Sequence, residues 1–144
     1  MSRVRLLAAV APLLLVALAA CGAAGDGGTG GVAGGDAALA RAFDTQASDL
    51  EVEGQGTVVR VLADDEEGAR HQRFVIRLDS GQTLLIAHNT DVAPRVDGLA
   101  VGDVVAFRGV YEWSAEGGTV HWTHRDPGGV HAAGWLRRDG RVYE

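Results

Sequence analysis

The sequence of 144 residues contains no lysine, a single cysteine and three prolines. The absence of lysine excludes a glycine-rich phosphate-binding loop, whose lysine contacts the nucleotide phosphates. The only cysteine, Cys21, precedes the part of the chain that can fold, so the folded part has neither a disulfide nor a thiol nucleophile. Its stability must therefore come from a hydrophobic core.

The N-terminus reads as a secretory signal. Arg3 and Arg5 precede an apolar run from Leu6 to Ala20, which is shorter than the about 20 residues of a membrane span. The run ends in Leu18-Ala19-Ala20-Cys21, which resembles a bacterial lipobox, so we expect residues 1–20 to be removed and Cys21 to carry acyl chains. The protein would then be anchored to a membrane on its periplasmic or extracellular side. A plain signal peptide with an incidental cysteine is the alternative.

Composition divides the rest of the chain into a tether and one domain. Residues 21–35 are mostly glycine and alanine, which is typical of a flexible linker, and residues 36–144 suit a single small domain. Without the two arginines of the signal, eleven arginines stand against nineteen acidic residues, a formal charge of −8. This balance argues against nucleic acid as a partner, because binding phosphates requires a basic surface.

Hydrophobic periodicity predicts a mainly β domain after a short helical start. Asp36 is a suitable N-cap for a helix over Ala37–Asp49, after which the apolar period changes to alternation. Alternation and turn residues predict strands at Gly54–Leu62, His71–Asp79, Gln82–His88, Val104–Trp113 and Thr119–His124.

The connections suggest how these strands assemble. Residues 89–100 suit a short helical connection, and Asp139-Gly140 is a strong turn signal for a C-terminal hairpin within Gly134–Glu144. Three strands, a short helical connection and two more strands are the order of an OB-type barrel. We therefore predict a five-stranded OB-like barrel with an N-terminal helix and a C-terminal hairpin.

Several short motifs resemble a family of small secreted bacterial proteins of unknown function. They are His71–Phe74, Ile86–Asn89 with Asp91, Gly102-Asp103, Tyr111–Trp113, His121-Trp122-Thr123-His124 with Asp126-Pro127, and Gly134-Trp135. The resemblance extends over about residues 39–143 and implies no activity or ligand. The strand order is also similar to that of thermonuclease-type barrels, but the chain lacks their Asp-Gly-Asp-Thr segment.

The densest group of possible metal ligands consists of His121, His124, Asp126 and His131. Imidazole and carboxylate suit Zn²⁺, but residues three apart on a strand point to opposite faces unless the strand ends early or bulges. The competing interpretation is that one of these imidazoles donates to a backbone carbonyl or to Asp126 and fixes the Asp126-Pro127 turn. No cofactor is needed in that case, and zinc belongs to the alternative of a metal-dependent hydrolase.

Two further groups could contact a ligand. Outward-facing Arg60, Arg73 and Arg77, with Arg108 nearby, could bind carboxylate or phosphate, although a solvated face paired with the many nearby acids is the favoured explanation. Trp122 and Trp135 could offer an aromatic platform, whereas Tyr111 and Trp113 share the phase of core positions. The candidate ligand-binding residues are Arg73, Arg77, His88, Trp122, His124, Asp126 and Trp135. The sequence thus predicts a non-enzymatic binding module of the cell envelope, with a glycan, a lipid head group or a protein as partner.

Overall fold

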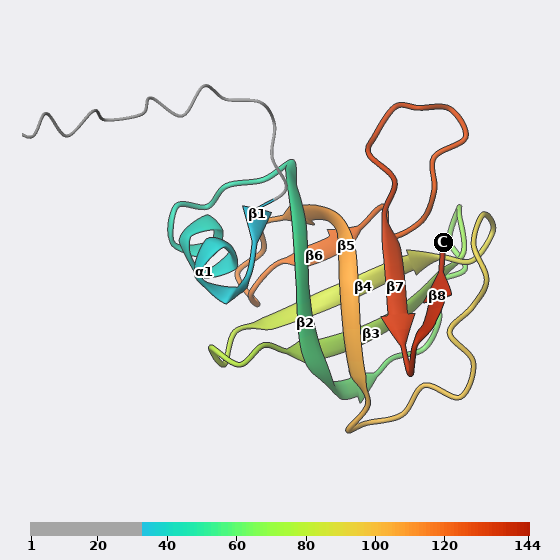
Figure 1. Ribbon diagram of the computed structural model, residues 1–144, viewed down its shortest axis with the longest axis horizontal. Coiled ribbons are helices and arrows are strands. Elements are labelled where there is room, and N and C mark those ends of the chain that lie inside the picture. Colours follow the sequence, from blue (N-terminus) through green and yellow to red (C-terminus); the bar gives the residue numbers. More distant parts are fainter. Residues whose placement is uncertain (1–32) are drawn as a thin grey trace, which may run out of the picture.

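The computed structural model describes residues 33–144, so the predicted signal peptide, Cys21 and the tether up to residue 32 lie outside the described residues. The elements follow in the order β1 (Ala33–Gly34), α1 (Asp36–Asp44), β2 (Leu50–Val61), β3 (His71–Arg77), β4 (Thr83–Asn89), β5 (Val104–Glu112), β6 (Thr119–His121), β7 (Trp135–Arg138) and β8 (Arg141–Tyr143) (Figure 1). Within this range, no helix has the length and apolar character that a membrane crossing requires.

Five of the strands close into a barrel. The sheet order is β2-β3-β4-β6-β5, and β5 pairs back with β2 from Leu50↔Tyr111 to Thr57↔Val104. Neighbouring strands run antiparallel except β4 and β6, which run parallel through Leu85↔Thr119. This closed, mainly β arrangement with one short helix confirms the predicted OB-like fold class.

The core lies inside this barrel because alternate residues of each strand point inward. Phe74, Ile76 and Leu78, which occupy alternate positions from β3 onward, are all buried. The largest fully buried side chains also include Leu84, Ile86, Phe107, Tyr111 and Leu136. Tyr111 is in the core as expected, and Trp113 packs partly buried against it, stacked on Phe43 at 6.4 Å between ring centroids.

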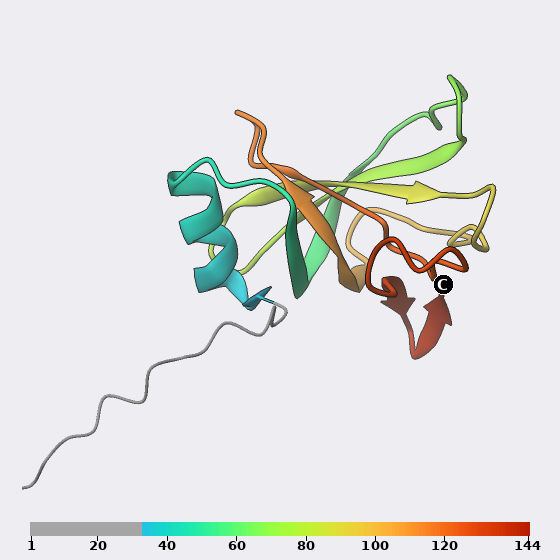
Figure 2. The ribbon, with the colours of Figure 1, turned by 90° about the horizontal axis from the view of Figure 1, so that it is seen from above.

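Helix α1 closes one end of the barrel (Figure 2). Its Leu39 has no exposed surface and belongs to the same core cluster as Phe107. The helix is shorter than predicted: it ends at Asp44, and Gln46 and Asp49 then adopt positive φ values of 54° and 58°. The helix period therefore breaks even though Ala47 still packs against the core.

The start of the domain differs from the prediction in two respects. Gly35, not Asp36, occupies the N-cap position, and the Asp36 carboxylate instead accepts a hydrogen bond of 2.7 Å from the Ser80 backbone N–H. Ala33 and Gly34, assigned to the tether from composition, pair with β2. Tertiary partners rather than local propensity decide both positions.

The connection between β4 and β5 was predicted to be helical, but the structure forms turns and irregular backbone there. Its position is set by the buried Gln72 of β3, whose side-chain amide donates to the Val96 carbonyl (3.0 Å) and accepts from the Val96 N–H (2.9 Å). An amide that pairs with a backbone in this way replaces the hydrogen bonds that a helix would have formed.

The predicted C-terminal hairpin is present as β7 and β8. Asp139 and Gly140 both adopt positive φ, 49° and 77°, which is the geometry of the tight turn that this dipeptide favours. Strand β7 pairs with β5 at Phe107↔Leu136, on the same edge of β5 that pairs with β6 further along. The hairpin therefore continues the sheet and adds Leu136 and Tyr143 to the core.

Candidate functional site

A groove of about 600 Å³ crosses the outer face of the barrel over β2, β3, β4 and β6. Its apolar floor consists of Val59, Leu62, Val75 and Leu85. The strand register brings the residues of the groove side by side, because Val75 lies opposite Leu85 and Leu85 lies beside Thr119. Outward-facing apolar residues on three adjacent strands thus form one continuous surface.

The connection between β5 and β6 forms one wall of this groove. Thr83 donates its hydroxyl to the Glu116 carbonyl (3.0 Å), Gln82 donates its side-chain amide to the Gly117 carbonyl (2.8 Å), and the Leu85 N–H donates to the Gly118 carbonyl (3.0 Å). These bonds fix the wall to β4, so the groove is formed without a ligand.

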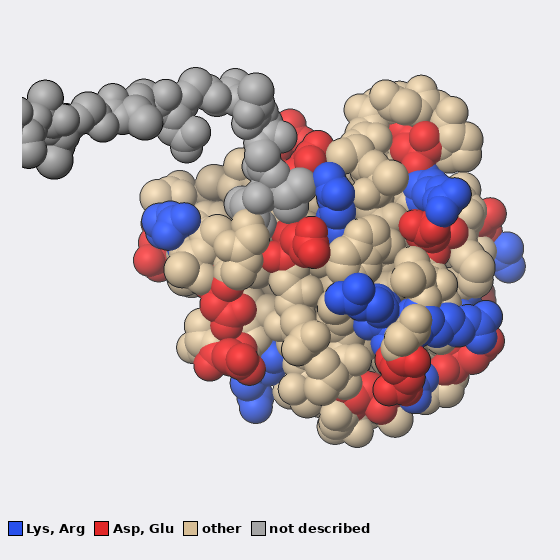
Figure 3. All heavy atoms as spheres, viewed as in Figure 1, with Lys and Arg blue, Asp and Glu red and all other residues tan. Residues whose placement is uncertain are grey.

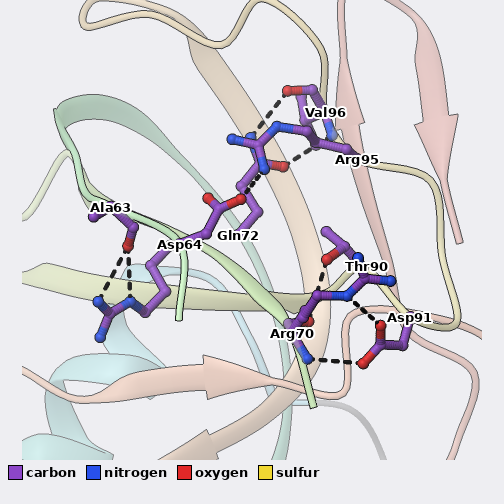
Figure 4. Close-up of polar contacts among 9 residues, drawn as sticks. Ala63, Asp64, Arg70, Gln72, Thr90, Asp91, Arg95 and Val96 are labelled. Carbon is purple, nitrogen blue, oxygen red and sulfur yellow. Dashed lines mark hydrogen bonds and ion pairs between the residues drawn. The ribbon is translucent and has the colours of Figure 1, made fainter. Parts of the chain in front are cut away.

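Two of the predicted arginines line the groove. Arg60 and Arg77 are exposed, and among residues 33–144 neither guanidinium forms a hydrogen bond or an ion pair. Arg73 differs, because its Nε and Nη2 both donate to the Ala63 carbonyl at 3.1 Å (Figure 4). Arg108 lies on β5 beside Glu51 at 3.8 Å. The structure therefore divides the predicted row, and only Arg60 and Arg77 remain available to a ligand.

Two other arginines, in the β2–β3 and β4–β5 connections, are already paired with carboxylates (Figure 4). Arg70 contacts Asp91 through its Nε (2.7 Å) and its backbone N–H (2.8 Å), and Arg95 pairs with Asp64. The hydrogen bonds from Arg70 lower the pKa of Asp91. These exposed pairs connect the β2–β3 and β4–β5 connections. On the face drawn in Figure 3, acidic and basic side chains are interspersed.

The predicted His-Trp-Thr-His segment lies where β6 ends. The strand stops at His121, three residues earlier than predicted, because Trp122 adopts a positive φ of 53°. Gly134 makes this conformation possible by packing directly on it, since a Cβ on Gly134 would lie 2.0 Å from the Trp122 carbonyl oxygen. The Gly134 N–H also donates to the His124 carbonyl at 2.9 Å.

The early end of β6 brings three imidazoles around one indole. Ring centroids of His121, His124 and His131 lie 5.5, 5.8 and 4.2 Å from that of Trp122. His124 is buried and its Nδ1 bonds the Arg125 carbonyl at 2.7 Å, while Nδ1 of His131 bonds the Ala132 carbonyl at 2.8 Å. Because a carbonyl only accepts, the proton of each imidazole in its neutral form lies on Nδ1, and Nε2 of the same ring carries a lone pair.

Asp126 fixes the turn through its own carboxylate. It accepts hydrogen bonds from the backbone N–H groups of Gly128 (2.8 Å), Val130 and His131 (3.1 Å), and these bonds lower its pKa. Among the described residues, His124 forms no hydrogen bond with Asp126. Its ring instead bonds a backbone carbonyl, which is one of the two partners predicted for an imidazole of this segment. His131 Nε2 lies 3.8 Å from Asp126 Oδ2.

These contacts leave the predicted ligands without metal-site geometry. Among residues 33–144, no group of three or more His, Cys, Asp or Glu side chains is arranged to hold a metal ion. His121 instead lies 3.6 Å from Glu112, and burial lowers its pKa. The metal-dependent hydrolase alternative therefore receives no support from the site geometry.

His88 and Trp135 do not belong to the group of rings formed by Trp122 with His121, His124 and His131. His88 has no exposed surface, and its Nε2 lies 3.0 Å from the Pro94 carbonyl while its Nδ1 lies 2.8 Å from the Thr123 hydroxyl. Burial lowers the pKa of His88. Trp135 lies under the Arg137 guanidinium and lines a different cavity, with Gln55 and Ala106. His88 thus has a structural role, and the two tryptophans share no platform.

Sequence reasoning missed two buried polar residues that position this region, Gln72 and Thr123. Gln72 occupies an inward position of β3, between the outward His71 and Arg73, and only the strand alternation pointed to its burial. Thr123 carried no signal, because its inward position depends on the turn at Trp122.

The fold and site together define a small OB-like barrel domain with a preformed surface groove. Residues 28–144 match the family described as "Protein of unknown function (DUF3465)", and the chain belongs to that family. No curated protein matches the chain. The family carries no assigned activity, so function has to be argued from the site.

Proposed function

We propose that the protein is a non-enzymatic binding module of the cell envelope whose groove over β2, β3, β4 and β6 holds a small anionic amphiphile. The observation that carries the proposal is an apolar floor flanked by two unpaired guanidinium groups. Val75 and Leu85 favour an apolar segment of the ligand, and Arg60 and Arg77 favour a carboxylate or phosphate at its end. Glu116 also lines the groove, so two positive charges oppose one negative charge, in a chain of net charge −6.

The proposal includes attachment to a membrane through Cys21. Its support is the lipobox-like Leu18–Cys21 and the glycine-rich residues that follow. A domain held at a lipid surface is exposed to fatty acids and lipid fragments, which have the chemistry that the groove favours. Membrane attachment and ligand class are thus mutually consistent.

Titration of the purified Cys21→Ser protein with three probes of equal chain length tests the groove. We expect dodecanoate and dodecyl phosphate to bind saturably below their micelle-forming concentrations, shifting the amide NMR signals of Leu85 and Thr119, and dodecanol to bind more weakly. Val75→Asp should abolish binding, because it places a charge in the apolar floor.

Single arginine variants test the charge contribution. Arg77→Ala and Arg60→Ala should each weaken binding of the two anions about two- to fivefold, because an exposed ion pair contributes about 0.2–1 kcal/mol. Arg41→Ala is the matched control, since Arg41 is exposed on α1, away from the groove. Equal affinity for the alcohol and the anions, or no saturable binding of any probe, would contradict the proposal.

A further inference from the structure

A second cavity, of about 250 Å³, lies at the end of β6 and shares no lining residue with the groove. Its lining residues are Ala69, His71, Asn89, His121, Trp122 and His124. Pockets for drug-sized ligands hold about 300–1,000 Å³, so this smaller cavity suits a single ring. The cavity lies outside the site of the proposed function and concerns a different ligand.

Trp122 forms one wall of this cavity, and its backbone is strained. The residue keeps 41% of its surface exposed, although the indole is large and apolar. Its left-handed φ of 53° is unfavourable for a bulky residue, and such strain persists at ligand sites where the surroundings enforce it. Here Gly134 packs on the Trp122 carbonyl, and the neighbouring Thr123 is tied to the buried His88. The backbone that carries the exposed indole is therefore fixed by contacts with neighbouring elements.

The polar lining leaves hydrogen-bonding capacity of both kinds. Nε2 of His124 carries an acceptor lone pair, because Nδ1 is bound to a carbonyl. Asn89 accepts from the Asp91 N–H through Oδ1 at 2.9 Å, which leaves the two amide hydrogens of its side chain as donors. Among residues 33–144, the His71 ring forms no hydrogen bond, and Nε2 of His121 is buried without a hydrogen-bond partner.

This combination favours a ring that carries hydroxyl groups. A hydroxyl both donates and accepts, so hydroxyl groups on one ring can pair with the Asn89 amide and with the His124 lone pair, and the C–H face of the ring can pack on the indole. An anion is disfavoured, because the lone pair of His124 would face its negative charge. We propose that this cavity binds one pyranose ring of a glycan, stacked on Trp122.

Indole NMR signals of the purified Cys21→Ser protein report on this site directly. The probes are methyl β-glucopyranoside and methyl N-acetyl-β-glucosaminide, with inorganic phosphate as the anionic comparison. We expect at least one glycoside to shift the Trp122 indole N–H signal saturably at millimolar concentrations. The Trp113 indole is an internal control and should not shift, because its N–H donates to the Phe43 carbonyl at 3.1 Å.

Variants separate the cavity from the groove and from folding. Asn89→Ala should weaken glycoside binding about fivefold through one lost hydrogen bond, and Trp122→Phe should retain more affinity than Trp122→Ala. In the two Trp122 variants, which lack the indole signal, the backbone amide signals of Asn89 and His121 are the readout. Arg77→Ala should leave glycoside binding unchanged, so that failure here and failure of the amphiphile groove are distinguishable. The amide spectrum of each variant reports whether it is folded; Asn89→Ala and Trp122→Phe carry the test if Trp122→Ala unfolds.

Three results would each overturn the proposal. They are the absence of a saturable shift with both glycosides, full retention of glycoside binding in both Asn89→Ala and Trp122→Phe, and equal shifts of the Trp122 signal with inorganic phosphate. The last result would identify the cavity as an anion site instead.

Discussion

Replacing His88 by alanine is the sharpest test of how the interior is held together. The ring is fully buried between the Thr123 hydroxyl, at 2.8 Å, and the Pro94 carbonyl, at 3.0 Å. Because a carbonyl only accepts, Nε2 carries the proton and Nδ1 accepts from Thr123. The His88→Ala change removes both partners and creates a void beside β4.

The size of the expected loss of stability depends on which former partner of His88 can form a new hydrogen bond. Pro94 is exposed, so its carbonyl can bind water, whereas Thr123 has no exposed surface and its hydroxyl stays unpaired. One buried unpaired hydroxyl and the void together cost about 2–4 kcal/mol. For a domain of this size the midpoint of thermal unfolding should fall by roughly 8–24 °C.

Urea unfolding followed by circular dichroism at about pH 7.5 measures this loss, with His71→Ala as the matched control. His71 is half-buried and its ring has no hydrogen bond within residues 33–144, so its replacement should cost below about 1 kcal/mol. In a double-mutant cycle with Thr123→Val, the two losses should not add, because both variants break the same bond. Equal losses for His88→Ala and His71→Ala would refute this account of the interior.

His88 should also make stability depend on pH. Burial lowers the pKa of its folded form below the ordinary value of 6.5 and outweighs the hydrogen bond with the Pro94 carbonyl, which acts in the opposite direction. The unfolded chain then binds a proton near pH 6.5 that the folded chain does not, so the free energy of unfolding falls as pH decreases from about 6.5 to the folded pKa. The half-buried His121, whose pKa burial also lowers, acts in the same direction. His88→Ala should flatten this dependence.

Four further changes test separate parts of the structure. Gly134→Ala should cost about 3 kcal/mol in urea unfolding, because its Cβ would lie 2.0 Å from a backbone oxygen, while Gly34→Ala, with nothing within 4 Å, should be neutral. His124→Ala should lower stability by about 1–3 kcal/mol, since a buried ring and its carbonyl bond are lost; a neutral effect would show that the turn after β6 holds without it. EDTA should leave the melting temperature unchanged, and a decrease would support a metal site at His121, His124, Asp126 and His131. Cys21→Ser should move the protein from membranes to the soluble fraction of fractionated cells, and retention would reject lipid anchoring.

Local patterns predicted the barrel because each strand carries its own information. Alternation in His71–Arg77 and Thr83–Asn89 gives one apolar and one polar face, and that pattern forms a sheet wherever partners exist. Asp139-Gly140 predicts its turn equally locally, since both residues tolerate positive φ. Fold class and most strand bounds were therefore readable from the sequence.

Features that depend on distant partners were not readable in this way. Residues 89–100 have the spacing of a helical turn, but Gln72 takes both backbone groups of Val96 and holds the segment as an irregular connection. The hydrogen bond that Asp36 accepts from the Ser80 N–H, in place of an N-cap role, has the same origin. In each case, a tertiary hydrogen bond outweighs a weak local preference.

For the candidate sites as well, one part was readable from the sequence and another part only from the structure. The sequence by itself determined which chemical groups exist: arginines at outward positions of the strands, and histidines close to Trp122 along the chain. Only the tertiary structure decided which of them are free, because Arg73 is bound by Ala63 and His88 by Thr123 and Pro94, while Arg60 and Arg77 face an open groove. It also placed Trp122 against a cavity, since the packing of Gly134 on its carbonyl enforces a backbone conformation that no local propensity of tryptophan favours.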